Sequence, residues 1–222
     1  MTFNSALADS VSSLISPTIS PTCFPEPLSA PLRLGVMASG SGSNFEAIAQ
    51  AIRAGQLHAQ IQVLIYNNPS AQAVERAQRW GIPTVLVNHR NFQEREECDR
   101  QIVQVLQQYE VQWVIMAGWM RRVTQILIDA FPDQMLNIHP SLLPSFPGIR
   151  AVEQALNAGV KISGCTVHVV RLEVDSGPIV MQAAVPVLSE DTPESLQARI
   201  QVQEHRIFPQ AIALAASAIH QH

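Results

Sequence analysis

The chain has 222 residues, of which 47% are hydrophobic and 14% charged, and a formal net charge of -4. This composition predicts a compact globular protein with a substantial core. Its basic residues are scattered singly, so we expect neither nucleic acid nor an anionic membrane surface as a partner. The three cysteines, Cys23, Cys98 and Cys165, lie far apart in the sequence; they lack the spacing of a disulfide framework or a zinc site and favour a reducing cytoplasm.

Residues 1–31 differ in composition from the rest of the chain. They contain seven serines and five prolines but no lysine, and the first arginine is Arg33. A signal peptide has a positive start and a long apolar centre, and a transit peptide is rich in arginine, so this segment matches neither. No run in the chain reaches the roughly 18 apolar residues that a membrane helix needs. We expect a disordered Ser/Pro-rich tail over residues 1–31 and a single domain over residues 32–222.

From Leu32 onward, short apolar runs alternate with longer amphipathic stretches, the pattern of βαβ units around a largely parallel sheet. The apolar runs predict strands, in chain order, at 32–38, 61–66, 84–87, 113–118 and 135–139. Between them, apolar residues at helical spacing predict helices at 44–55, 71–81 and 92–109. These elements together predict an α/β fold with an open, mostly parallel sheet flanked by helices.

The last part of the chain has a different pattern. Two apolar segments, at 162–171 and 179–188, flank the turn sequence VDSGP and predict a late hairpin of antiparallel strands. Thr192, followed by Pro193 and Glu194, has the composition of a helix N-terminus. We therefore expect a long C-terminal helix over 192–219 that closes the fold.

The sequence ASGSGSNFEAI, residues 38–48, joins the first predicted strand to the first predicted helix. Backbone N–H groups and the helix dipole favour an anion at such a junction. The third glycine of a dinucleotide fingerprint would fall at Phe45, and the Gly-Lys-Ser of a P-loop is absent. A site for a single small phosphate therefore fits best, and the alternative is an ordinary tight turn with a helix cap.

In MLNIHPSLLP, Asn137 and His139 lie two residues apart at the carboxyl end of a buried strand. Their side chains then leave the same face of the strand, about 6.5 to 7 Å apart. Ligands of open α/β sheets bind at the carboxyl ends of the strands. An amide and an ionisable imidazole on one face are suited to stabilising a developing oxyanion.

A carboxylate is the expected third member of this group. Asp175, in the VDSGP turn, is the best-placed candidate, because a carboxylate beside His139 favours the imidazolium and can relay a proton. The alternative is purely structural, with His139 buried in the core, Asn137 ending a strand and Asp175 forming a turn. No nucleophile elbow and no HExxH metal motif occurs in the sequence. We therefore expect direct acyl transfer to a bound nucleophile, without a metal.

Five motifs, in this order and spacing, resemble the phosphoribosylglycinamide formyltransferase family of purine biosynthesis: SGSGSNF, MAGWMRRV, NIHPSLLPSFPG, HVVRLEVDSGPIVMQ and QVQEHRIFP. The similarity extends over residues 32–215. The resemblance implies a Rossmann-like sheet and transfer of a formyl group from the co-substrate 10-formyltetrahydrofolate to the amine of glycinamide ribonucleotide, with no metal.

The resemblance also implies roles for individual residues. Asn137 and His139 match groups that stabilise the oxyanion, and Asp175 matches the carboxylate that assists proton transfer. The matches to residues that bind the ribonucleotide are Gly42, Ser43, Asn44, Glu204 and, more weakly, Gln201. The matches to residues that bind the folate are Arg95, for its acidic tail, and Met120, Arg121, Arg122, Val123 and Asn137. Arg150 replaces a histidine of some family members and receives no role.

Related folate enzymes and a non-catalytic protein are the alternatives. A methionyl-tRNA formyltransferase is expected to carry a further basic domain for tRNA, which the negative net charge disfavours. A formyltetrahydrofolate deformylase, which transfers the formyl group to water, needs no phosphate loop and is expected to have a regulatory domain that residues 1–31 are too short to form. A binding protein that had lost catalysis would not need all three polar site residues.

Overall fold

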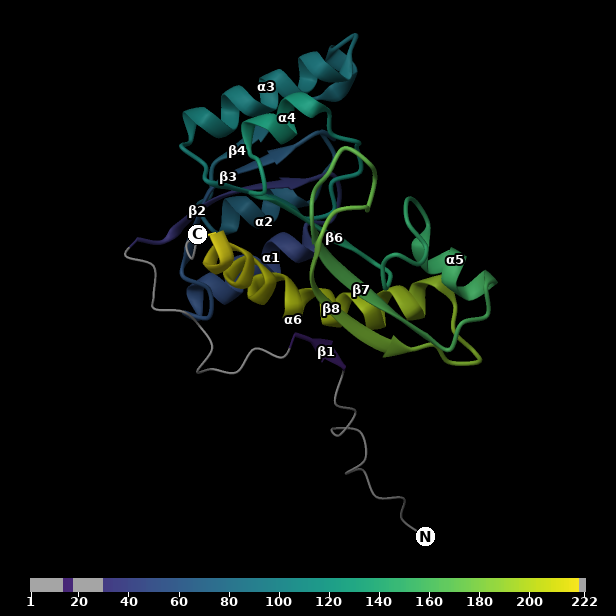
Figure 1. The fold of residues 1–222 in the computed structure, drawn as a ribbon. Helices are drawn as coiled ribbons and strands as arrows, with labels where there is room; N and C mark the ends of the chain where they lie inside the picture. Colours follow the sequence, from purple (N-terminus) through teal and green to yellow (C-terminus); the bar gives the residue numbers. More distant parts are fainter. Residues whose placement is uncertain (1–13, 18–29, 220–222) are drawn as a thin grey trace.

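The structure is a computed structural model that describes residues 14–17 and 30–219. In this part of the chain, strands alternate with helices (Figure 1). The strands are β1 (Ile15–Ser16), β2 (Leu32–Ala38), β3 (Ala59–Tyr66), β4 (Thr84–Leu86), β5 (Trp113–Met116), β6 (Met135–His139), β7 (Ile162–Val169) and β8 (Ile179–Pro186). The helices are α1 (Ser43–Arg53), α2 (Ala73–Arg79), the 3-10 helix η3 (His89–Asn91), α3 (Arg95–Gln108), α4 (Gln125–Ala130), α5 (Ala151–Asn157) and α6 (Pro193–Ile219).

All eight strands form one sheet in the order β1-β8-β7-β6-β5-β2-β3-β4. Strands β4, β3, β2, β5 and β6 pair in parallel, whereas β7, β8 and β1 are added in antiparallel orientation. The predicted α/β sheet with a late antiparallel hairpin is therefore confirmed. Its hairpin places β7 directly beside β6, the strand that carries Asn137 and His139.

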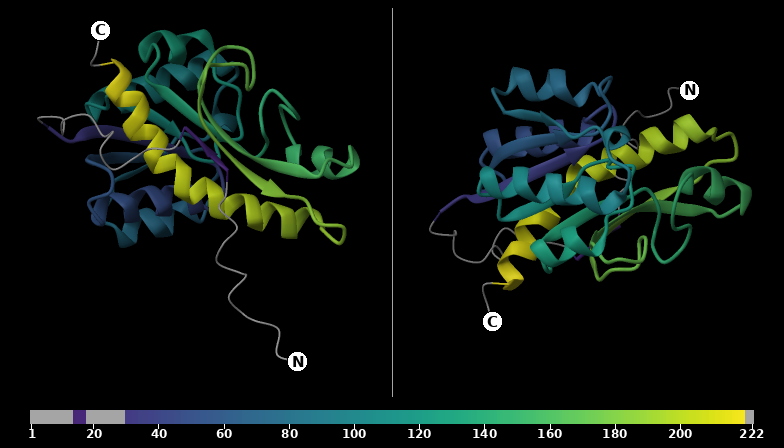
Figure 2. Two further views of the ribbon diagram at one scale, coloured as in Figure 1. Left: turned by 60° about the horizontal axis from the view of Figure 1, so that its bottom comes forward. Right: turned by 90° about the horizontal axis from the view of Figure 1, so that it is seen from above.

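Helices cover both faces of the sheet (Figure 2). On one face α1, α2 and α6 pack against the strands through buried residues such as Phe45, Ile48 and Phe208. On the other face α3 and α4 contribute Ile102, Leu106 and Leu127 to a second apolar cluster. Because apolar area on both sheet faces is removed from water, the central strands consist mostly of apolar residues, as in the predicted buried runs.

Helix α6 begins where the sequence predicts. The Thr192 N–H donates to Ser195 Oγ, and the Ser195 N–H donates to Thr192 Oγ1, so the two side chains cap the first turn reciprocally. From this cap the helix runs across the sheet to Ile219. The long C-terminal helix of the prediction is confirmed.

Helices α4 and α5, the 3-10 helix η3 and strand β1 were not predicted. Helices α4 and α5 contain only six and seven residues, so any apolar spacing within them is short.

The prediction of a disordered tail does not hold for Ile15–Ser16, which pairs with Gln182 and Ala183 at the edge of β8. Ile15 packs against the core there, which offsets the cost of ordering a short segment. Residues 1–13 and 18–29 of the predicted tail lie outside the described residues.

None of the described helices combines the length and the apolar character that crossing a bilayer requires.

Gly164 lets β7 and β8 approach closely. A Cβ at this position would lie 2.0 Å from the carbonyl oxygen of Ala183, which is backbone and cannot move aside cheaply. We expect Gly164→Ala to lower the free energy of unfolding by about 1–3 kcal/mol, the usual cost of overpacking, as measured by urea denaturation. Gly40→Ala is the control, because a Cβ on Gly40 meets no atom within 4 Å. Equal stability of the two variants would contradict the prediction.

Candidate active site

A cavity of about 960 Å³ opens at the carboxyl ends of β2, β5 and β6. Loops that follow these parallel strands meet at one edge of the sheet, where open α/β folds bind ligands. The antiparallel strand β7, the VDSGP turn and helix α6 complete the wall. Twelve of the thirteen predicted site residues line this cavity: Gly42, Ser43, Asn44, Met120, Arg121, Arg122, Val123, Asn137, His139, Asp175, Gln201 and Glu204.

Asn137 and His139 face the cavity from the same side of β6, as their spacing predicts. His139 is only 5% exposed, so its polar atoms need partners inside the protein. Its Nε2 lies 2.9 Å from the carbonyl oxygen of Phe146, and its Nδ1 lies 3.3 Å from Oδ2 of Asp175. Both partners are acceptors, so each ring nitrogen of His139 faces an oxygen to which an N–H group can donate.

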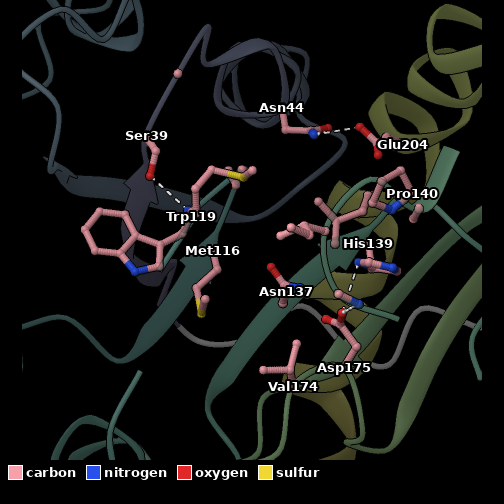
Figure 3. A pocket seen from close by; sticks show the side chains of 18 of the residues that line it. Ser39, Asn44, Met116, Trp119, Asn137, His139, Pro140, Val174, Asp175 and Glu204 are labelled. Carbon is pink, nitrogen blue, oxygen red and sulfur yellow. Dashed lines mark hydrogen bonds and ion pairs between the residues drawn. The ribbon is translucent and has the colours of Figure 1, made fainter. Parts of the chain in front are cut away.

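Asp175 reaches His139 from a turn with unusual backbone geometry. Its φ of 55° lies in the left-handed region, which aspartate and asparagine tolerate better than other non-glycine residues. The side chain is 7% exposed and points toward His139, as Figure 3 shows. Its Oδ2 also accepts a hydrogen bond of 2.8 Å from the Gly148 N–H. The turn and the loop before α5 therefore fix the carboxylate in one position.

The protonation state of Asp175 follows from opposing effects. Burial by itself raises the pKa of the carboxyl group. The contact with the His168 ring and the hydrogen bond from the Gly148 N–H, together with the nearby His139 ring, outweigh burial and hold the pKa of Asp175 below its ordinary value. The group is therefore a carboxylate at neutral pH and a suitable partner for a protonated His139.

The sequence analysis missed one member of this cluster. His168 on β7 is 2% exposed and lies opposite Asn137 in the antiparallel pairing. Its Nδ1 lies 3.0 Å from the Val169 carbonyl oxygen, so this nitrogen carries the hydrogen, and its Nε2 lies 3.1 Å from Nδ2 of Asn137 and 3.5 Å from Oδ1 of Asp175. With its hydrogen on Nδ1, His168 accepts a hydrogen bond from Asn137 at Nε2 and fixes the orientation of that amide. The pairing of β6 with the strand before the VDSGP turn was the signal that could have identified it.

We expect His168→Leu to lower kcat about 3- to 10-fold, the value of one hydrogen bond that orients a catalytic amide. His168→Gln retains an acceptor near the Asn137 amide, so it should recover most of this loss. Steady-state kcat of the two variants, at saturating concentrations of both substrates, measures the difference. Equal losses in both variants would mean that His168 acts only through packing.

At the other end of the cavity, α6 contacts the first turn of α1. Asn44 Nδ2 donates to Glu204 Oε2 at 2.9 Å, as Figure 3 shows, and Gln201 Nε2 donates to Ser43 Oγ at 2.7 Å. Helix α1 begins after Gly42, whose φ is 72°, and no side chain in the described part of the chain caps this end. The first-turn N–H groups therefore remain suited to an anion.

Glu204 is almost completely buried. Burial raises the pKa of its carboxyl group, although the hydrogen bond from Asn44 opposes this shift. The Oδ1 atom of Asn44 is buried and has no partner among the described residues. One acceptor of the Asn44–Glu204 pair is therefore unused among the described residues.

The segment after β5 forms the third wall. The Met120 N–H donates to Ser39 Oγ at 2.9 Å, and Arg121 donates to Cys98 Sγ, which ties this segment to the loop after β2 and to α3. Arg122 is exposed and Val123 is buried. Arg95 is the predicted site residue that the structure places outside the lining, exposed at the first turn of α3. Within the described residues, no group of three or more His, Cys, Asp or Glu side chains is arranged to hold a metal ion.

Comparison with known proteins places this site in a family. Residues 32–212 match the family model described as Formyl transferase, and this span contains the whole cavity lining. The chain belongs to the formyl transferase family. The family predicted from the sequence motifs is therefore confirmed.

Several known proteins are similar to this formyl transferase over most of its length. The phosphoribosylglycinamide formyltransferase of Bacillus subtilis (strain 168) is 39% identical over 180 residues, covering 81% of this chain and 92% of that protein. The crystal structure of glycinamide ribonucleotide transformylase 1 from Symbiobacterium toebii is 46% identical with a TM-score of 0.84, covering 86% of this chain and 90% of that one. The trifunctional purine biosynthetic protein adenosine-3 of Homo sapiens is 44% identical over 185 residues, which are 83% of this chain but only 18% of that protein.

Proposed function

We propose that this formyl transferase moves the formyl group of 10-formyltetrahydrofolate to the amine of glycinamide ribonucleotide, yielding formylglycinamide ribonucleotide and tetrahydrofolate in purine biosynthesis. The observation that carries the proposal is that one cavity holds Asn137, His139 and Asp175 together with the uncapped N-terminus of α1. Chemistry at a carbonyl and recognition of a phosphate are thereby combined in one site.

The geometry supports a direct transfer. The substrate amine attacks the formyl carbon, and the carbonyl oxygen becomes an oxyanion that Asn137 Nδ2 and a protonated His139 stabilise. An oxyanion near His139 competes with the Phe146 carbonyl for the Nε2 hydrogen. As the bond from the formyl carbon to the folate nitrogen breaks, a proton lost by the attacking amine passes to that nitrogen, and the Asp175 carboxylate stabilises the charged imidazole during this transfer.

Each substrate is assigned to one end of the cavity. The ribonucleotide phosphate binds the backbone and side chains of Gly42, Ser43 and Asn44 beside Gln201, and its ribose contacts Glu204. The folate binds along Met120, Arg121, Arg122 and Val123, with Asn137 at its formyl group. Arg95, outside the lining, interacts with the acidic tail of the folate where it leaves the cavity. We also propose that residues 32–222 form a single domain that works without a metal in the cytoplasm.

Release of tetrahydrofolate tests the proposal directly. The purified protein is incubated with 10-formyltetrahydrofolate in the presence and absence of glycinamide ribonucleotide. Release that depends on the ribonucleotide supports the transferase. Release without it indicates a deformylase, and binding of both ligands without release indicates a non-catalytic protein.

A further inference from the structure

The loop assigned to the substrate phosphate contains no charged side chain. Residues 39–44 read SGSGSN, and the ionisable side chain in the first turn of α1 is the acid Glu46. Backbone N–H groups and a helix dipole supply only about half of a positive charge. A cation on another element would therefore strengthen the binding of a phosphate dianion at this loop.

Arg76 on α2 provides a cation directly behind the loop. Its Nε donates to the Ser41 carbonyl oxygen at 2.8 Å, and its Cδ lies 3.4 Å from the position that a Cβ on Gly42 would occupy. The N–H of Ala73, also on α2, donates to the Gly40 carbonyl oxygen at 3.2 Å. Helix α2 thus holds two successive peptide units of the loop by their oxygens.

The two hydrogen bonds from α2 to the Gly40 and Ser41 oxygens determine the direction of the loop N–H groups. The C=O and N–H of a trans peptide unit point in opposite directions. With the Gly40 and Ser41 oxygens bonded to α2, the N–H groups of Ser41 and Gly42 point away from α2. All three residues line the active-site cavity, so the loop can present these donors to an anion.

The other ionisable groups near Arg76 leave its positive charge available to an anion at the 39–44 loop. Glu46 Oε2 lies 3.4 Å from Arg76 and 3.3 Å from Arg79, so two arginines share one carboxylate. A second cavity, of about 860 Å³, lies behind the loop and is lined by Ser43, Arg76, His205 and Arg206. Burial and then the charge of Arg76 lower the pKa of His205, so this ring is neutral at neutral pH. Arg206 donates to Gln203 on its own helix.

We infer that Arg76 is a positioning residue for the phosphate of the substrate: it orients the donors of the 39–44 loop and supplies positive charge behind them. The inference rests on the proposed function. Arg76 does not line the cavity that holds Asn137, His139 and Asp175, so we expect its contribution to be equal in the ground state and the transition state. Loss of Arg76 should therefore change KM for the ribonucleotide and leave kcat unchanged.

Arg76→Gln and Arg79→Gln form a matched pair. Each removes one positive charge and one contact with Glu46, but only Arg76 contacts the loop. We expect Arg76→Gln to raise KM for glycinamide ribonucleotide about tenfold, the worth of one charge-assisted interaction. The kcat and the KM for 10-formyltetrahydrofolate should stay within about twofold of wild type. Arg79→Gln should behave like wild type.

A substrate without the phosphate distinguishes an effect of Arg76 on phosphate binding from a structural effect of the substitution on α1. With glycinamide riboside, kcat/KM of Arg76→Gln should equal that of wild type, whereas a loss as large as with the ribonucleotide overturns the inference. Arg76→Lys, which keeps the charge, should give an intermediate KM and replaces Arg76→Gln if that variant does not fold. An unchanged KM in the variants of an active wild type overturns the Arg76 inference alone. A wild type that does not use the ribonucleotide overturns the proposed function.

Discussion

Asp175→Asn is expected to lower kcat by about 10²- to 10⁴-fold, the range of contributions from acid–base groups. Asparagine tolerates the left-handed φ of 55° that this turn requires, and its side-chain oxygen can still accept the Gly148 N–H. The change therefore removes the charge beside His139 and little else. Steady-state kcat with both substrates saturating measures the effect, and thermal unfolding checks that the fold is intact.

The pH dependence of stability provides an independent check on the same residue. The folded-state pKa of Asp175 is lowered, so its carboxylate contributes stability above the unfolded pKa, and this contribution is lost as the pH falls through the folded pKa. Asp175→Asn has no such group and should lose less stability than wild type between neutral and acidic pH. Near-normal kcat in the variant would remove Asp175 from the mechanism, and identical acid-side stability would show that its pKa is not lowered.

Helices and strands with a long or regularly spaced set of apolar residues were predictable from the sequence. Strands β2 and β6 begin and end at the predicted residues, because continuous apolar runs bounded by polar residues define buried strands. Asn137 and His139 share a face because strand geometry alternates side chains between two faces. The proximity of Asp175 was inferred from its chemistry and from the family resemblance, and the left-handed turn that places it there became visible only in the structure.

Contacts between distant segments were not predictable in the same way. His168 has no local pattern that distinguishes it from a core histidine, and its role depends on the antiparallel register that sets it opposite Asn137. The contact between Arg76 and the Ser41 carbonyl joins α2 to a loop 35 residues earlier. Strand β1 is only two residues long, and it forms because β8 offers a free edge at the end of the sheet.

Asn137→Ala is expected to lower kcat by about 10²- to 10³-fold with little change in either KM, because a donor to the oxyanion acts mainly in the transition state. The Asn137 Nδ2 atom carries two hydrogens, and the 3.1 Å contact with His168 uses one of them, which leaves the other for the cavity. Asn157→Ala, at an exposed position on α5, is the control and should keep wild-type kcat.

The double variant Asn137→Ala/His168→Leu tests how the two residues are connected. If His168 acts by orienting the Asn137 amide, His168→Leu should cost the full 3- to 10-fold in the wild type, about the value of one hydrogen bond, and almost nothing once Asn137 is alanine. Two residues that act through one interaction are not additive, whereas independent contributions multiply in the rate. Multiplication of the two losses would therefore assign His168 a function of its own, through its 3.5 Å contact with Asp175.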